Sequence, residues 1–85
     1  MPRDYRVLID FEVLEALPRS GRRRNDLVTF LRSLGSFAHE GGDFQLKDPQ
    51  TLRTFEVSVL CGFAVTWWID APVNEVKVID IRPSS

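Results

Sequence analysis

The 85 residues of the chain suffice for one small domain with a single modest core and are too few for two. A hydrophobic fraction of 44% with nine aromatic residues argues against a disordered chain, and the net charge of −1 gives no sign of a general nucleic-acid binder. One cysteine cannot form an internal disulfide, no apolar run approaches the roughly 20 residues of a membrane span, and no signal-peptide core follows Met1. We therefore expect one domain, residues 1–85, in the cytoplasm.

Charge is unevenly distributed along the chain. Residues 1–34 hold seven arginines and five acidic residues, whereas residues 35–85 hold four basic and seven acidic residues. The excess positive charge lies in one group of arginines: Arg19, Arg22, Arg23, Arg24 and Arg32. Such a group is most often a solvated face, and the alternative is a patch that binds an anion or a partner protein.

The first predicted element is a strand at Tyr5–Phe11, where apolar residues take every second position. A short helix is predicted at Glu12–Leu17, with Asp10 in the N-cap position and Pro18 ending the helix.

A second helix is predicted from a cap at Ser20 to about Leu34, and Gly35 is expected to end it. Its apolar stripe, spaced to pack on a sheet, consists of Leu27, Phe30, Leu31 and Leu34. Three consecutive arginines in the first turn oppose the helix dipole. Either the regular helix begins nearer Asn25 or these arginines serve an anionic partner.

Periodicity is lost from Gly35 to Asp43, which indicates a loop. Phe44–Lys47 is predicted as a short edge strand. Asp48–Thr51 is predicted as a turn, with Pro49 in the second position that type I turns favour.

The strongest signal in the sequence is a β-meander of three strands at Thr54–Leu60, Phe63–Ile69 and Asn74–Ile81. Cys61-Gly62 forms the short connection between the first two. The third strand carries apolar residues on both faces, as a strand covered on both sides would. Helices early and strands late predict an α+β fold in the order β-α-α-β-β-β-β, a mostly antiparallel twisted sheet with two N-terminal helices packed on one face.

Four further residues could carry chemistry or binding. Trp67 and Trp68 are adjacent on a strand and must face opposite ways, so we expect one of them in the core. The other is either covered by a terminal segment or available to a partner, and we favour the partner. His39 has no second His or Cys to make a metal site, and we expect a surface loop residue. Cys61 is expected to be a packing thiol. No metal or cofactor is predicted.

Four features occur in order along nearly the whole chain. They are a Tyr5-x-Val7 opening strand, a helix ending in Phe30-Leu31-x-x-Leu34, the pair Gly42-Asp43, and a meander closing on Val76-x-Val78-x-x-Ile81-Arg82. In this combination the sequence resembles the RelE/ParE superfamily of bacterial toxins, the toxin halves of two-gene toxin–antitoxin modules. The resemblance implies a single RelE/ParE-like domain.

RelE-like toxins cleave messenger RNA in the ribosomal A site by making the 2′-hydroxyl attack the neighbouring phosphate. The resemblance implies that basic residues stabilise the phosphoryl oxygens. Arg82 matches the family's C-terminal arginine, Arg53 approximately matches its sheet arginine, and Lys47 could stand for the lysines near the second strand. These three are the predicted catalytic residues.

The sequence also departs from the family. Gly62-Phe63-Ala64 stands where many members have a Gly-Tyr-Arg step, and no Tyr or His follows Arg82 as a general acid. Acidic residues on the predicted sheet would repel RNA: Glu56, Asp70, Glu75 and Asp80. The alternative role for Arg53 and Arg82 is surface pairing with nearby acids.

Three functions follow as hypotheses. The first is a ribosome-dependent mRNA endonuclease that inhibits translation, the second is a ParE-like inhibitor of DNA gyrase, and the third is a non-toxic protein-binding module that keeps the fold. Under all three the expected partner is an antitoxin whose extended segment folds on binding, with the sheet edge at Phe44–Lys47 or Tyr5–Phe11 accepting a strand. Ribosome and mRNA are further expected partners of the first, a membrane is not, and the assembly would be a homodimer or a toxin–antitoxin complex.

Overall fold

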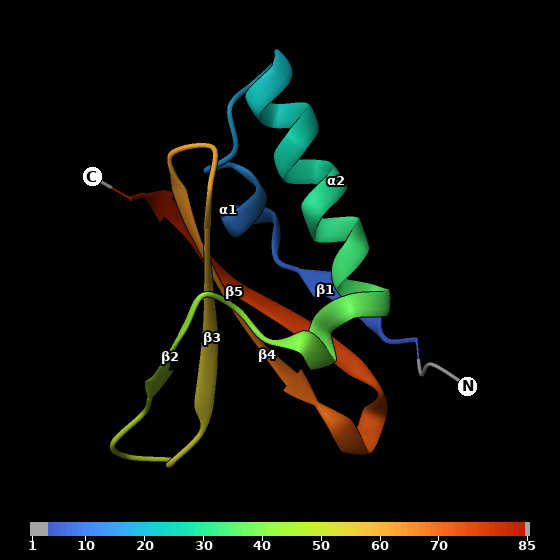
Figure 1. The fold of residues 1–85 in the computed structure, drawn as a ribbon, viewed down its shortest axis with the longest axis vertical. Coiled ribbons are helices and arrows are strands. Elements are labelled where there is room, and N and C mark those ends of the chain that lie inside the picture. Colours follow the sequence, from blue (N-terminus) through green and yellow to red (C-terminus); the bar gives the residue numbers. More distant parts are fainter. Residues whose placement is uncertain (1–3, 85) are drawn as a thin grey trace.

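The computed structural model describes residues 4–84 (Figure 1). The elements are β1 (Arg6–Ile9), α1 (Phe11–Leu14), α2 (Arg22–Phe37), the 3₁₀ helix η1 (Ala38–Glu40), β2 (Phe44–Lys47), β3 (Thr54–Leu60), β4 (Phe63–Asp70), the 3₁₀ helix η2 (Ala71–Val73) and β5 (Glu75–Pro83). The predicted α+β class is confirmed, with one long helix and a mostly antiparallel sheet. None of the helices in this part of the chain has the length and apolar character that a membrane span requires.

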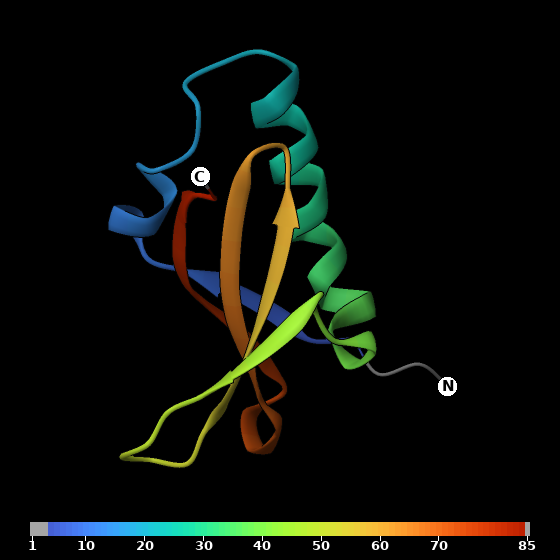
Figure 2. The same cartoon turned by 60° about the vertical axis from the view of Figure 1, so that its left-hand side comes forward.

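The five strands form one sheet in the order β1-β5-β4-β3-β2. β1 pairs with β5 in parallel, and the other three neighbouring pairs are antiparallel. α2 lies along one face of this sheet (Figures 1 and 2). The first predicted helix is only the four-residue α1, whose Val13 and Leu14 pack against the core.

The core lies between α2 and the sheet. α2 contributes the buried residues of its predicted stripe, Leu27, Leu31 and Leu34, while Phe30 is half-buried at its edge. The sheet contributes alternate residues of β4 and selected residues of β5: Phe63, Val65, Trp67, Val76, Val78 and Ile81. Trp67 is the largest fully buried side chain, and its indole Nε1–H donates to Ser58 Oγ at 3.4 Å. The expectation that one of the two adjacent tryptophans lies in the core is confirmed, and the buried one is Trp67.

The prediction that Gly35 ends the second helix is wrong, because α2 continues to Phe37. Gly35 instead lies where the helix approaches the chain just before β1. The Tyr5 N–H donates to the Gly35 carbonyl oxygen at 2.7 Å, and a Cβ on Gly35 would lie 2.9 Å from the Tyr5 carbonyl oxygen. The glycine is needed for this close contact and does not stop the helix.

The predicted helix start is also corrected. Gly21 is the N-cap residue, with φ of 92° and no side-chain cap, so the cap is not Ser20, and the helix begins at Arg22 rather than near Asn25. Two of the three consecutive arginines at the start of α2 donate hydrogen bonds to nearby backbone carbonyl oxygens. Arg23 Nε donates to the Cys61 carbonyl oxygen at 3.0 Å, and Arg24 Nη1 donates to the Pro18 carbonyl oxygen at 3.0 Å. These two bonds join the start of α2 to the β3–β4 turn and to the segment before the helix.

The expectation that β5 is covered on both faces is wrong. The β4–β5 register shifts by one residue between the pairs Thr66↔Asp80 and Trp67↔Val78, leaving Ile79 as an extra residue in β5. This bulge reverses the alternation, so that Ile81 returns to the core face already used by Val78. Ile79 is 43% exposed.

The bounds predicted for β2 and β3 are confirmed, and the remaining boundaries differ from prediction by at most three residues. The predicted opening strand narrows to β1 because Phe11 begins α1, and the predicted loop after Gly35 holds the end of α2 and η1. The Cys61-Gly62 turn is confirmed, and both φ values are positive, 54° and 78°, as tight hairpin turns require.

Candidate functional site on the open face of the sheet

The face of the sheet turned away from α2 carries an apolar surface that the sequence did not assign. Register fixes this orientation, since Glu56 and Ser58 of β3 pair with the core residues Trp67 and Val65. The intervening residues of β3 must therefore point to the opposite side. That side receives Phe55, Val57 and Val59, the apolar set whose alternation predicted the strand.

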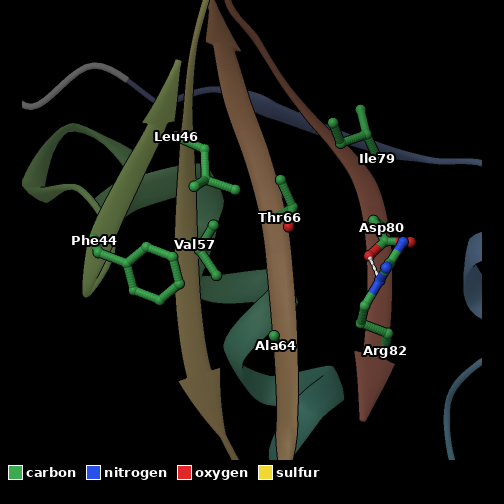
Figure 3. A pocket seen from close by; sticks show the side chains of 8 residues that line it. All are labelled: Phe44, Leu46, Val57, Ala64, Thr66, Ile79, Asp80 and Arg82. Carbon is green, nitrogen blue, oxygen red and sulfur yellow. Dashed lines mark hydrogen bonds and ion pairs between the residues drawn. The ribbon is translucent and has the colours of Figure 1, made fainter. Parts of the chain in front are cut away.

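A cavity of about 530 Å³ opens on this face (Figure 3). One wall is apolar and comes from β2 and β3, the floor comes from β4, and the far wall comes from β5 and carries the charged Asp80 and Arg82 beside Ile79. Its lining residues are Phe44, Leu46, Val57, Ala64, Thr66, Ile79, Asp80 and Arg82. A concave site with one apolar and one charged wall can hold a ligand that is itself part apolar and part anionic.

Arg82 is the predicted catalytic residue that lies in this cavity. Its Nε donates to Asp80 Oδ2 at 2.5 Å, and this hydrogen bond raises the pKa of Arg82 above its ordinary value (Figure 3). Its side chain is 71% exposed. An exposed ion pair such as Arg82–Asp80 contributes little free energy because solvent screens it. A phosphate could therefore replace Asp80 as the partner of the Arg82 guanidinium at little cost in free energy.

Arg53, the second predicted catalytic residue, stacks on Trp68. Its Cζ atom lies 3.8 Å from the centroid of the Trp68 ring, and Lys77 Nζ lies 5.2 Å from the same ring. Trp68 is half-buried. Within residues 4–84, basic side chains therefore cover part of the outer tryptophan, and its use by a partner stays a prediction.

The structure does not gather the three predicted catalytic residues. Arg82 pairs with Ala64 of β4, whereas Arg53 lies over Trp68 of the same strand. Ala64 and Trp68 are four residues apart, which is roughly 13 Å at the usual rise of a strand. Lys47 pairs with Thr54, which shares the α2 side of β3 with Glu56. Lys47 therefore points to the other side of the sheet from Arg82.

The sequence also missed Asp80 as part of the site. The spacing Asp80-x-Arg82 places both side chains on one face of a regular strand, and this i, i+2 relation was a usable signal. The two other residues considered for chemistry lie elsewhere. His39 is exposed in η1, and Cys61 is half-buried in the β3–β4 turn, with its carbonyl oxygen bound by Arg23.

Comparisons with known proteins bear on the fold. The sequence matches no protein-family model and no curated protein. Among solved structures, a chain in the crystal structure of the toxin–antitoxin complex RelBE2 from Mycobacterium tuberculosis is similar to this one, with a TM-score of 0.69 and 15% sequence identity. The match covers 94% of this chain and 98% of that chain. Because it extends over both chains almost completely, this protein has a RelE-like fold.

Proposed function

We propose that the protein is the toxin of a type II toxin–antitoxin module and that it inhibits translation by cleaving messenger RNA on the ribosome. One observation carries the proposal: nearly the whole chain has the fold of a chain in a toxin–antitoxin complex. An antitoxin is accordingly the proposed partner, in the cytoplasm. Because one fold can serve many functions, the proposed cleavage activity depends on the residues that lie on the open face of the sheet.

In this proposal the cavity on the open face holds one RNA phosphate and its flanking sugar. Arg82 binds the phosphoryl oxygens as the RNA 2′-hydroxyl attacks the neighbouring phosphorus, since its planar fork of N–H donors matches a phosphate and neutralises the charge that develops there. Asp80, on the same wall, is a carboxylate that can accept the proton of the attacking hydroxyl. The bond between phosphorus and the 5′-oxygen of the next nucleotide breaks, that oxygen takes up a proton from water, and a 2′,3′-cyclic phosphate remains on the other fragment.

Arg53 would act at a different place on the same RNA strand. The β4 positions beside the two arginines, Ala64 and Trp68, are roughly 13 Å apart along the strand, so Arg53 is assigned to a neighbouring part of the RNA. Its guanidinium, stacked on Trp68, offers a cationic plane for a second phosphate or for a base. Lys47, on the other side of the sheet, would contribute only to the general attraction of RNA.

The test is cell-free translation of a defined message with purified protein, followed by mapping of new 5′ ends. We expect cuts at ribosome-bound codons, a loss of roughly 10²–10³-fold in cleavage rate for Arg82→Ala, and a smaller loss for Arg53→Ala. Arg32→Ala, an exposed arginine on α2, is the matched control and should cleave as the unchanged protein does. Intact message with normal translation would refute the nuclease.

A second candidate function is inhibition of DNA gyrase. The dispersion of Arg82, Arg53 and Lys47 favours it, because an inhibitor that acts by binding needs no gathered acid and base. A supercoiling assay with purified gyrase distinguishes the two. Blocked supercoiling with intact message would select this function, and normal growth on full induction with neither effect would select a non-toxic binding module.

A further inference from the structure

The cavity on the open face has two unlike walls that stand opposite each other across the sheet. Strand register sets four residues in one row: Phe44, Val57, Thr66 and Asp80. The first and last members of this row are three strand spacings apart, roughly 14 Å. Arg82 lies on the same wall as Asp80, so a phosphate bound there leaves the opposite side of the cavity, beside Phe44, for another part of the ligand.

The cavity is hollow because its floor residues are small, and Phe44 stands at the side of this floor. Ala64 and Thr66 of β4 form the floor between the walls. Phe44 and Val57 are cross-strand partners, and Figure 3 shows the Phe44 ring directed toward Val57, which is only 3% exposed. The ring is thus supported by the sheet, while 48% of the residue stays open to solvent. An aromatic surface that is held in place and left open can take a stacked base.

A second aromatic and basic pair lies one row further along the sheet. Trp68 follows Thr66 by two residues in β4, roughly 7 Å along the strand, and the Arg53 Cζ atom lies 3.8 Å from its ring centroid. The open face therefore carries two aromatic rings and two arginines, Phe44 with Arg82 and Trp68 with Arg53. Aromatic and basic side chains combined on one surface are how proteins hold an unpaired nucleic-acid strand, because the rings take bases and the cations take phosphates.

We propose that Phe44 is the base-stacking residue of the cavity and seats the base of the nucleotide whose phosphate Arg82 binds. The inference rests on the RNA-cleaving function proposed above and adds the residue that selects an unpaired strand. A base that lies on Phe44 has left the stack of its own strand, so paired RNA cannot occupy the site. A purine covers more of the ring than a pyrimidine and extends further toward Leu46, so purines bind more tightly.

Binding of short single-stranded RNA to the isolated chain tests the proposal without ribosomes and without cleavage. One probe is an adenosine tetranucleotide whose 2′-hydroxyls are methylated, so that the attacking group is blocked. The other has the same backbone and charge but no bases. NMR titration of the protein measures both dissociation constants. We expect the adenosine probe to bind roughly tenfold more tightly, and its ring currents to shift the Leu46 methyl resonances.

Three variants make the test specific to the ring. Phe44→Leu keeps an apolar side chain beside Val57, and it should weaken the adenosine probe roughly tenfold while leaving the baseless probe unchanged. Phe37→Leu, the matched control, makes the same change at a 56% exposed phenylalanine at the end of α2 and should bind both probes normally. Arg82→Ala should weaken both probes equally and lower the slope of the salt dependence by about one. The dispersion of the amide resonances shows in the same spectra that each variant is folded.

Three results would overturn the base seat. They are a Phe44→Leu variant that binds the adenosine probe as tightly as the unchanged protein, a variant that loses the same factor with both probes, and a protein that binds neither probe at the highest concentration. Failure of the nuclease is a separate result. Intact message together with a ring-dependent preference for the adenosine probe would leave Phe44 as a base seat on a protein that binds RNA without cutting it. Cleavage that Phe44→Leu leaves unchanged would keep the nuclease and remove the base seat.

Discussion

At the scale of single residues, the contact between α2 and the chain before β1 depends on one glycine. Gly35 is a poor helix former, and alanine would be favoured there by about 1 kcal/mol on propensity alone. The Cβ of that alanine would nevertheless meet the Tyr5 carbonyl oxygen at 2.9 Å, which is backbone and cannot rotate away. Packing therefore outweighs helix propensity at this position.

Gly35→Ala is accordingly expected to destabilise the protein by about 1–3 kcal/mol, as overpacking usually does, because α2 must move away from Tyr5. Urea unfolding followed by circular dichroism measures the change. Thr29→Ala, on an exposed position of the same helix, is the matched control and should be neutral or slightly stabilising. An equally neutral Gly35→Ala would mean that the segment before β1 moves without cost.

At the scale of elements, the β2–β3 turn is held by one carboxylate. Asp48 accepts the Gln50 N–H at 2.9 Å and the Thr51 hydroxyl at 3.0 Å, and the Gln50 bond contributes most to lowering the pKa of Asp48 below its ordinary value of 3.8. The side chain of an Asp at the first position of a turn commonly binds the backbone two residues on. This turn sets the register that presents β2 at the sheet edge.

Because the pKa of Asp48 is lower in the folded state, its stabilising contribution is complete above pH 3.8 and is lost as pH falls through the lower folded value. We expect the Gln50 amide resonance in an NMR titration to shift with a midpoint below pH 3.8. Asp48→Asn should abolish this transition, whereas Asp26→Asn on α2 should leave it in place. A midpoint at or above 3.8 would show that the two hydrogen bonds are not formed in solution.

At the scale of the whole molecule, the long helix α2 covers one face of the sheet, and in the part of the chain that the structure describes the opposite face stays open (Figure 2). A domain of this size has a single core, so its stability depends on few residues. The adjacent tryptophans of β4 report on the two faces. Trp67 is fully buried against α2, and Trp68 is half-buried beneath Arg53.

Trp67→Ala should cost about 3–5 kcal/mol, since it removes the largest side chain of the core and leaves a cavity. That is a large share of the roughly 5–15 kcal/mol that holds a small domain folded, so the variant is expected to be largely unfolded at 37 °C. Trp68→Ala should cost far less, because solvent and Arg53 already border that ring. Thermal unfolding of the pair measures the contrast, and equal losses would contradict the assignment of the two faces.

Much of the secondary structure followed from the sequence because it depends on local chemistry. Alternating apolar residues predicted the strands, the spacing of the α2 stripe predicted a helix against a sheet, and Cys61-Gly62 predicted a tight hairpin turn. Each of these signals is contained within a few consecutive residues. The resemblance to the RelE/ParE superfamily added the fold, which the structural comparison supports.

The tertiary structure alone decided which face of each strand is covered and where the site lies. A period of two divides a strand into two faces without saying which one meets the helix, so the apolar set of β3 turned out to face the open side. The bulge in β5 and the role of Gly35 depend on partners distant in sequence. For the same reason the sequence could nominate Arg82, Arg53 and Lys47 one by one, but their separation along and across the sheet is set by strand register, which long-range pairing determines.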